Sequence, residues 1–173
     1  SVEIFDMEVD RPTLEFAAQT IKDCNPRFVL IVATGQNPNA STASMTGTVE
    51  LAEVVKECYP EYKIGIVGPH VNALPLETLN RHDFVDIVFT NEGVYALNDL
   101  LSSDINKDLN KVNGIAYRDR DGVHINPPAS IVQQDKLGID MPGVAYDLMP
   151  SFDNYRTSTW HCNYDVYIDV NFA

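Results

Sequence analysis

The chain has 173 residues, of which 45% are hydrophobic and 21% are charged, and it carries a net charge of −13. This balance is typical of a globular domain and excludes wholesale disorder. The 25 acidic residues against 12 basic ones, with no basic stripe, exclude binding to a nucleic-acid backbone as the main activity. No apolar run approaches the roughly 18 residues of a membrane span, so no membrane partner is expected.

The three cysteines, Cys24, Cys58 and Cys162, are far apart and form no Cys-x-x-Cys pair. They therefore indicate neither a disulfide framework nor a zinc site. A reducing compartment suits such a chain, so we expect a cytoplasmic protein. Cys24 and Cys58 fall at apolar positions of expected helices, and we expect both in the core.

Short apolar runs alternate with helical periodicities along residues 2–101. The runs that predict strands, because they are short and rich in β-branched residues, are Val2–Phe5, Phe28–Ala33, Ile64–Val67 and Val85–Phe89. The segments that predict helices are Leu14–Ile21, which Asn25-Pro26 stops, Leu51–Cys58, Pro75–Asn80 and Ala96–Leu101. This β-α-β-α-β-α-β-α order predicts a parallel sheet with right-handed crossovers.

Only four parallel strands are predicted, whereas doubly wound sheets have about five or more. We therefore expect an α/β fold, a Rossmann-like (flavodoxin-like) parallel sheet that lacks its first strand. In this interpretation a first strand and helix would precede Ser1 in a longer protein.

Residues 113–128 change the pattern. Apolar and polar residues alternate from 115 to 117 and again from 123 to 125, on either side of an Asp121-Gly122 turn, which predicts a β-hairpin. From Ala129 onward the periodicity fades, and an extended arm that packs on a neighbour is expected. The chain thus divides into a Rossmann-like domain (1–112), a hairpin extension (113–128) and a linker (129–173).

Three polar loops follow the expected inner strands, at Thr34–Ser41, Gly68–Asn72 and Thr90–Gly93. Parallel strands place such loops along one edge of the sheet, where open α/β sheets bind ligands. Glycine admits a close approach of the backbone, and Thr and Asn offer neutral donors and acceptors, which suits a large polar cofactor. The candidate contacts are Thr34, Gly35, Asn37, Gly68, His70, Glu92 and Gly93.

Two of these candidates have other interpretations. His70 is a hydrogen-bond donor to a cofactor, a metal ligand or an ordinary surface residue, and Glu92 is a candidate carboxylate cap of the following helix. No catalytic residue and no metal-ligand set is predicted. Nucleotide-binding glycine fingerprints, a Gly-x-Ser-x-Gly elbow and an acidic phosphoacceptor at the end of a central strand are absent from the sequence.

Several segments match the motifs of one known family. They are the loop Gly68-Pro69-His70, the block Asn91-Glu92-Gly93-Val94 with Leu97, Leu100 and Leu101, the hairpin Gly114-Ile115-Ala116-Tyr117-Arg118 with Gly122, and the linker Pro142–Pro150 followed by Trp160-His161. Through them, nearly the whole chain resembles the N-terminal cobalamin-binding domain of cobalamin-dependent radical S-adenosylmethionine enzymes. Asn91 departs from the pattern, because the family has glycine there.

The resemblance implies that residues 1–112 bind cobalamin, with the corrin on the sheet edge and the nucleotide tail beside the strands. The family's Cys-x3-Cys-x2-Cys motif is absent here, so the iron–sulfur cluster and S-adenosylmethionine would belong to the C-terminal catalytic barrel of a longer parent. In that parent, cobalt would carry a methyl group toward a substrate radical, and this segment alone would bind rather than catalyse. The alternatives are a docking domain that has lost the corrin and a flavodoxin-like domain for another small cofactor.

Overall fold

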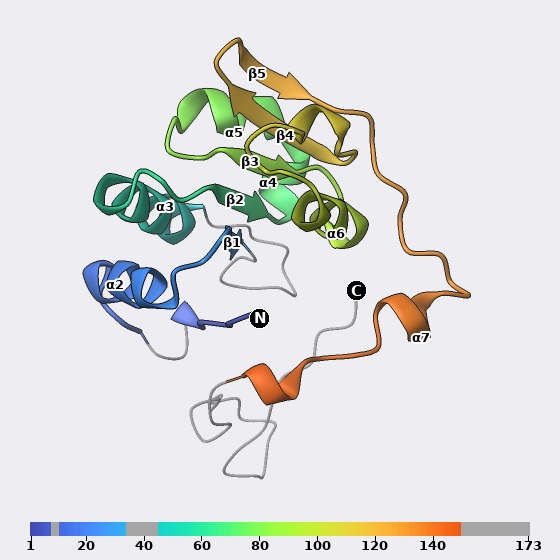
Figure 1. Cartoon of the computed structure of the whole chain (residues 1–173), viewed down its shortest axis with the longest axis horizontal. Helices are drawn as coiled ribbons and strands as arrows, with labels where there is room; N and C mark the ends of the chain where they lie inside the picture. The colour runs from blue at the N-terminus through green and yellow to red at the C-terminus, as the bar shows by residue number, and fades with distance from the viewer. Residues whose placement is uncertain (8–10, 34–44, 150–173) are drawn as a thin grey trace, which may run out of the picture.

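The computed structural model describes residues 1–7, 11–33 and 45–149 (Figure 1). The helices are α2 (Leu14–Cys24), α3 (Thr46–Cys58), α4 (Pro69–Ala73), α5 (Pro75–Arg81), α6 (Val94–Ser102) and α7 (Leu137–Asp140). The strands are β1 (Val29–Val32), β2 (Ile64–Val67), β3 (Ile87–Phe89), β4 (Ile115–Asp119) and β5 (Gly122–Ile125). Single turns of 3-10 helix, η2 (Leu109–Lys111) and η3 (Tyr146–Leu148), complete the described elements.

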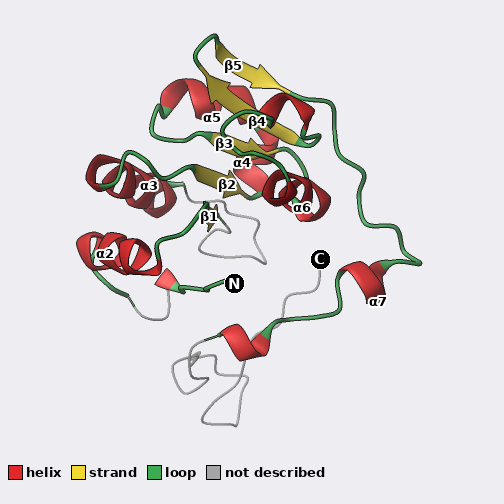
Figure 2. Ribbon diagram, in the orientation of Figure 1, coloured by secondary structure: helices red, strands yellow, loops and turns green. Residues whose placement is uncertain are grey.

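The strands form one mixed sheet in the order β1-β2-β3-β4-β5 (Figure 2). β1, β2 and β3 pair in parallel, with Val29 opposite Ile64 at the start of the β1–β2 ladder. β4 pairs antiparallel with β3 and with β5. The predicted α/β class with an appended hairpin is therefore confirmed, and the hairpin extends the same sheet.

The predicted strand at residues 2–5 is wrong. These residues run as coil below β1 in Figure 1, and none of them enters the described sheet. Val2 is 63% exposed and Ile4 is 45% exposed. An apolar run becomes a strand only where a neighbouring strand bonds to its backbone N–H and C=O groups. No described strand pairs with residues 2–5.

Side chains of the sheet alternate between two apolar layers, as the pleat requires. Ile64, Ile66 and Val88 face the layer that contains α2, α3, α4 and α5. Ile87, Phe89, Ile115 and Tyr117 face the layer formed by α6 and the segment around η2. One face of the sheet therefore carries the helices before β3, and the other face carries the helix after it.

The predicted helix boundaries around α2 are confirmed by its caps. The Oγ1 of Thr13 accepts a hydrogen bond from the Phe16 N–H, and Asn25 ends the helix in a left-handed conformation with φ 47°. The prediction that Cys24 and Cys58 lie in the core is wrong, because both thiols are exposed. Each is the last residue of its helix and lies after the residues through which that helix is buried.

Asp86 is a buried carboxylate, 8% exposed, at the amino end of the parallel strands. Its Oδ2 accepts hydrogen bonds from the Ile64 N–H and the Lys56 Nζ, both at 2.9 Å. Its Oδ1 accepts one from the Lys63 Nζ, also at 2.9 Å. This network joins α3, the start of β2 and the residue before β3, so one side chain holds three elements together.

Replacement of this carboxylate tests its contribution to folding. Asp86→Ala removes the acceptor of the Ile64 N–H and of the Lys63 ammonium and one of the two acceptors of the Lys56 ammonium, so we expect the free energy of unfolding to fall by about 2–3 kcal/mol. Glu77→Ala is the control, because it removes only the exposed i,i+4 pair with Arg81, and it should change that free energy by no more than about 0.5 kcal/mol. Urea denaturation followed by circular dichroism measures both; equal effects would contradict the assignment.

Candidate functional site

The carboxyl ends of β1, β2 and β3 lie at one edge of the sheet, because the three strands are parallel. The turns after β2 and β3 bring four of the predicted site residues to that edge: Gly68, His70, Glu92 and Gly93. The other three, Thr34, Gly35 and Asn37, lie outside the described residues. The geometry of the site is therefore that of the second and third turns.

Gly68 connects the end of β2 to α4, with φ 153°. A Cβ at this position would fall on the carbonyl oxygen of Ala33, the residue after β1. Ala33 itself donates its N–H to the Val67 carbonyl at 2.8 Å. The close approach that this glycine allows is thus between two segments of the chain's own backbone, and its contact with a cofactor stays a prediction.

The predicted loop at residues 68–72 is wrong, because α4 begins directly at Pro69. Proline suits the first helical position, since its missing N–H would have no partner there and its φ is already helical. His70 therefore lies in the first turn of a helix and is half-buried. Its imidazole makes no hydrogen bond or ion pair with another described residue.

The turn after β3 is closed by Asn91. Its Oδ1 accepts a hydrogen bond from the Gly93 N–H at 2.9 Å, and Gly93, the residue just before α6, has φ 79°. The interpretation of Glu92 as a helix cap is wrong, because its side chain makes no cap bond; its Oε2 lies 3.5 Å from the Val132 N–H instead. The spacing Asn-x-Gly is the signal that could have identified Asn91 as the turn-forming residue.

Sequence reasoning also missed that this turn holds the start of the C-terminal arm. The Nδ2 of Asn91 donates to the Ala129 carbonyl at 3.2 Å, and the Oη of Tyr95 donates to the Asp140 Oδ2 at 2.6 Å. That hydrogen bond is the main cause that raises the pKa of Tyr95, with smaller contributions from desolvation and from nearby carboxylates. Residues 129–140 therefore leave the domain beside the candidate site.

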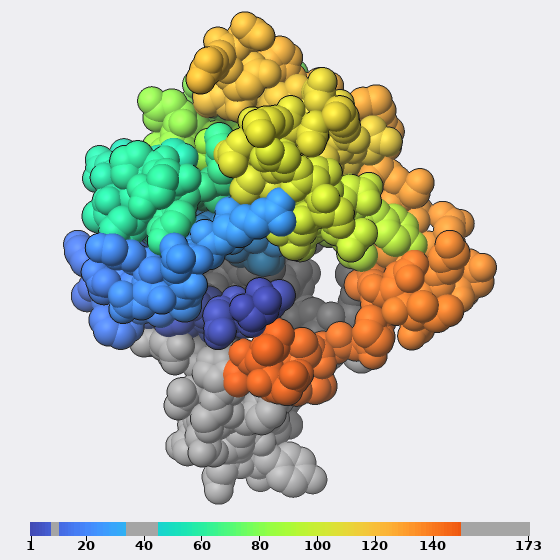
Figure 3. Space-filling model, viewed as in Figure 1, coloured from blue at the N-terminus to red at the C-terminus, as the bar shows by residue number. Residues whose placement is uncertain are grey.

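A groove with a volume of about 850 Å³ lies along β1. Its walls are residues 2–7, α2 and β1, and it reaches the start of α3, at the carboxyl edge of the sheet. Figure 3 shows the dark blue N-terminal residues below the lighter blue segment that leads into β1. Most of the exposed surface of the groove is apolar.

No group of three or more His, Cys, Asp or Glu side chains is arranged to hold a metal ion within residues 1–7, 11–33 and 45–149. Over the same ranges, none of the helices is long and apolar enough to cross a membrane.

The close approach at Gly68 can be tested by adding one methyl group. Gly68→Ala should lower the free energy of unfolding by more than about 2 kcal/mol, because the new Cβ collides with the backbone of Ala33. Gly47→Ala in α3 is the matched control: no atom lies within 4 Å of its added Cβ, and alanine stabilises a helix by up to about 1 kcal/mol relative to glycine. Thermal unfolding of both variants measures the contrast; a silent Gly68→Ala would contradict it.

No protein-family model matches the chain. It is 26% identical over 156 residues to an uncharacterized methyltransferase of Pyrococcus horikoshii, covering 90% of this chain and 32% of that protein. It is 30% identical over 83 residues to the cobalamin-dependent radical SAM methyltransferase TokK of Streptomyces tokunonensis, covering 47% of this chain and 12% of TokK. The chain thus spans about a third or less of these relatives.

Solved structures share the fold. OxsB, a cobalamin-dependent S-adenosylmethionine radical enzyme with aqua-cobalamin bound, superposes with a TM-score of 0.61 at 20% identity, over 81% of this chain and 18% of that one. The same enzyme with aqua-cobalamin and S-adenosylmethionine bound gives a TM-score of 0.59 at 21% identity, over 76% and 18% of the two chains. The resemblance predicted from the motifs, to the cobalamin-dependent radical S-adenosylmethionine enzymes, is therefore confirmed.

Proposed function

We propose that residues 1–112 are the cobalamin-binding module of a longer radical S-adenosylmethionine enzyme that transfers methyl groups. The proposal rests on the fact that the sequence comparison and the fold comparison point to the same kind of enzyme. The sequence is similar over 156 residues to a methyltransferase, and the fold is similar to an enzyme that binds aqua-cobalamin. Both cover only part of the longer proteins, as expected for a module.

The described part of the edge fits a broad, uncharged ring system. Gly68 and Gly93 have no side chains, and a Cβ added at them would meet Ala33 and the side chains of Val67 and Phe89, respectively. Gly93 is buried, and a Cβ there would meet the Val67 Cγ2 at 3.3 Å, so the two turns are packed side by side. At these two glycine positions a macrocycle would meet no side chain of the turn residue itself.

Each candidate residue has a role in this proposal. The backbone of Gly68 and Gly93 contacts the face of the corrin, and the His70 imidazole, which has no described partner, donates a hydrogen bond to it. Glu92, which is exposed at the same edge, accepts one from an amide of the ring's periphery. Thr34, Gly35 and Asn37 are proposed to complete the contact from the loop after β1.

Bound cobalamin would supply a cobalt ion that carries the methyl group, while this chain binds and orients the ring. The catalytic barrel, the iron–sulfur cluster and S-adenosylmethionine would belong to the rest of the parent. Residues 113–128 would be the hairpin extension and residues 129–173 the linker toward the barrel. The large apolar side chains that stay exposed along the arm support this last role, and they include Ile131, Leu137, Ile139, Met141, Val144 and Leu148.

A docking domain that no longer binds cobalamin is the second candidate function. The exposed apolar arm favours it as much as it favours the first candidate, because both require the arm to pack against a neighbouring domain. The two differ only in whether the sheet edge binds the corrin. A third candidate function is a flavodoxin-like domain for another small cofactor. A yellow preparation that carries flavin would favour it, whereas a red preparation would favour cobalamin.

Hydroxocobalamin binding tests the proposal directly. Titration of the chain should shift the visible spectrum of the cobalamin, and the red colour should elute with the protein on gel filtration. The same titration of a polypeptide extended at the N-terminus is the necessary companion, since missing contacts could weaken binding to the shorter chain. If neither polypeptide retains cobalamin, the docking function is favoured and the proposal is wrong.

A pair of histidine variants locates the binding site. His70→Ala should weaken cobalamin binding by roughly tenfold, the value of one hydrogen bond to the ring. His82→Ala is the matched control, because His82 directly follows α5 at the opposite edge of the sheet, where its ring packs against Phe84. Equal dissociation constants for the two variants would show that His70 does not contact the cofactor.

A further inference from the structure

The side chain of Asn91 bonds in two directions at the proposed cofactor edge. Its Oδ1 accepts a hydrogen bond from the Gly93 N–H at 2.9 Å, and its Nδ2 donates to the Ala129 carbonyl at 3.2 Å. An asparagine amide carries its acceptor oxygen and its donor nitrogen on the same carbon, so the two atoms move together. Because both are bonded, the position of this amide depends on the turn after β3 and on the C-terminal arm.

A second chain of hydrogen bonds joins the same two segments through Gly114, the residue before β4. The Thr90 N–H, at the start of the turn after β3, donates to the Gly114 carbonyl at 2.9 Å. The Gly114 N–H donates in its turn to the Pro127 carbonyl at 2.7 Å. The turn is therefore connected to the start of the arm through Thr90 as well as through Asn91.

Gly114 also packs closely against the start of the arm. Its φ is 77°, and a Cβ there would lie 2.6 Å from the Ala129 Cβ and 3.3 Å from the Ala96 Cβ of α6. The first of these distances is well below the separation at which packed carbon atoms rest. Ala129 packs in addition on the apolar layer that contains α6. Residues 127–132, which these contacts hold against the domain, form the arm seat.

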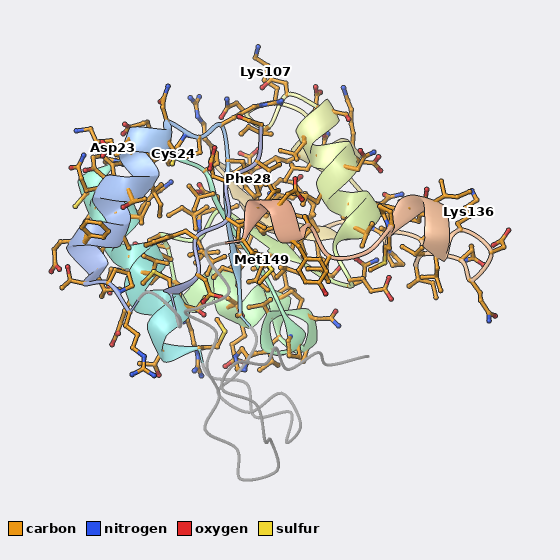
Figure 4. All side chains as sticks on the ribbon, turned by 90° about the horizontal axis from the view of Figure 1, so that it is seen from below. Asp23, Cys24, Phe28, Lys107, Lys136 and Met149 are labelled. Carbon is orange, nitrogen blue, oxygen red and sulfur yellow. The ribbon has the colours of Figure 1, made fainter. Side chains whose placement is uncertain are left out.

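Beyond the arm seat, residues 133–148 are all exposed. Figure 4 shows α7, which Lys136 precedes, projecting from the domain on the side of α6. The last residue of α7, Asp140, accepts the hydrogen bond from the Tyr95 Oη at 2.6 Å. The exposed part of the arm is covalently joined to the arm seat, so a displacement of the arm reaches the turn after β3 through the seat.

We propose that Asn91 is a positioning residue that couples the arm seat to the cofactor edge. While the arm occupies its seat, Asn91 holds the backbone of Gly93 in the conformation that contacts the corrin. The inference rests on the proposed function for the identity of the ligand, whereas the coupling itself rests on the contacts of Asn91 and Gly114. Because coupling between two sites is reciprocal, a ligand that binds the ordered turn also stabilises the seated arm.

The geometry of Glu92 favours cooperation rather than competition between the arm and the ligand. Its Oε2 lies 3.5 Å from the Val132 N–H, and its Oε1 makes no hydrogen bond with another described residue. A carboxylate has two oxygens and accepts from two donors at the same time. Glu92 can therefore accept from an amide of the ring without releasing the arm seat.

Asn91→Asp separates the two bonds, because it keeps an oxygen for the Gly93 N–H and loses the donor to the Ala129 carbonyl. Amide hydrogen exchange of the 173-residue chain without cofactor is the measurement. The buried Gly114 amide reports on the arm seat, and both it and the Gly93 amide should exchange about fivefold faster in the variant. A purely local role would leave Gly93 unchanged or slower, since a carboxylate is the stronger acceptor. That result, or an unchanged Gly114, would overturn the proposal.

Tyr95→Phe is the matched control, because it removes the bond to Asp140 and leaves the arm seat in place. The Gly93 and Gly114 amides of this variant should exchange within about twofold of the unsubstituted chain. The Ile64 amide, which is bonded to Asp86 at the other end of the sheet, reports on general stability in both variants. Equal acceleration in the two variants, or acceleration of Ile64 by the same factor in Asn91→Asp, would overturn the role of Asn91.

Hydroxocobalamin provides the reciprocal measurement. It should slow exchange of the Gly114 amide about fivefold in the unsubstituted chain, and Asn91→Asp should bind it about fivefold more weakly and show no such slowing. Tyr95→Phe should bind it within about twofold of the unsubstituted chain. Faster exchange of Gly114 on binding would show that arm and ligand compete, and would overturn the proposal. If no cobalamin binds but the amides respond to Asn91→Asp as expected, the proposed function is wrong and the coupling of turn and arm is upheld.

Discussion

Parallel pairing of β1, β2 and β3 is the constraint on which the rest of the structure depends. Asp86 secures it at the amino end by binding Lys56, Lys63 and the Ile64 N–H. At the carboxyl end, the missing side chain of Gly68 lets Ala33 approach the end of β2. Because both ends are fixed, the strands end in register, and the turns that follow them share one edge.

That edge has two roles, which fall to neighbouring residues of one turn. The turn after β3 forms part of the proposed corrin floor through Gly93, and it also holds the C-terminal arm through Asn91 and Glu92. The arm leaves the domain beside the site, so a domain attached to it would lie close to a cofactor bound there. This arrangement suits a module that presents a cofactor to a partner domain in the same polypeptide.

Part of the candidate site followed from sequence alone, because a run such as residues 64–67 with a Gly-Pro break predicts both a strand and its end. The positions of Gly68, His70, Glu92 and Gly93 at one edge depended only on the strands being parallel. The bonding of Glu92 to the arm could not be predicted, because its partner Val132 is 40 residues away in the sequence. The role of Asn91 had a local signal in its spacing to Gly93.

Local chemistry in the sequence determined the elements whose signals are complete within a few residues. These are α2, with Thr13 before it and Asn25-Pro26 after it, β2, and the hairpin around Asp121-Gly122. Only the tertiary structure decided that residues 2–5 are not a strand and that Cys24 and Cys58 are exposed. The physical reason is that a strand needs a neighbour for its backbone groups, and burial needs a surface to pack against, and neither is encoded in the segment itself.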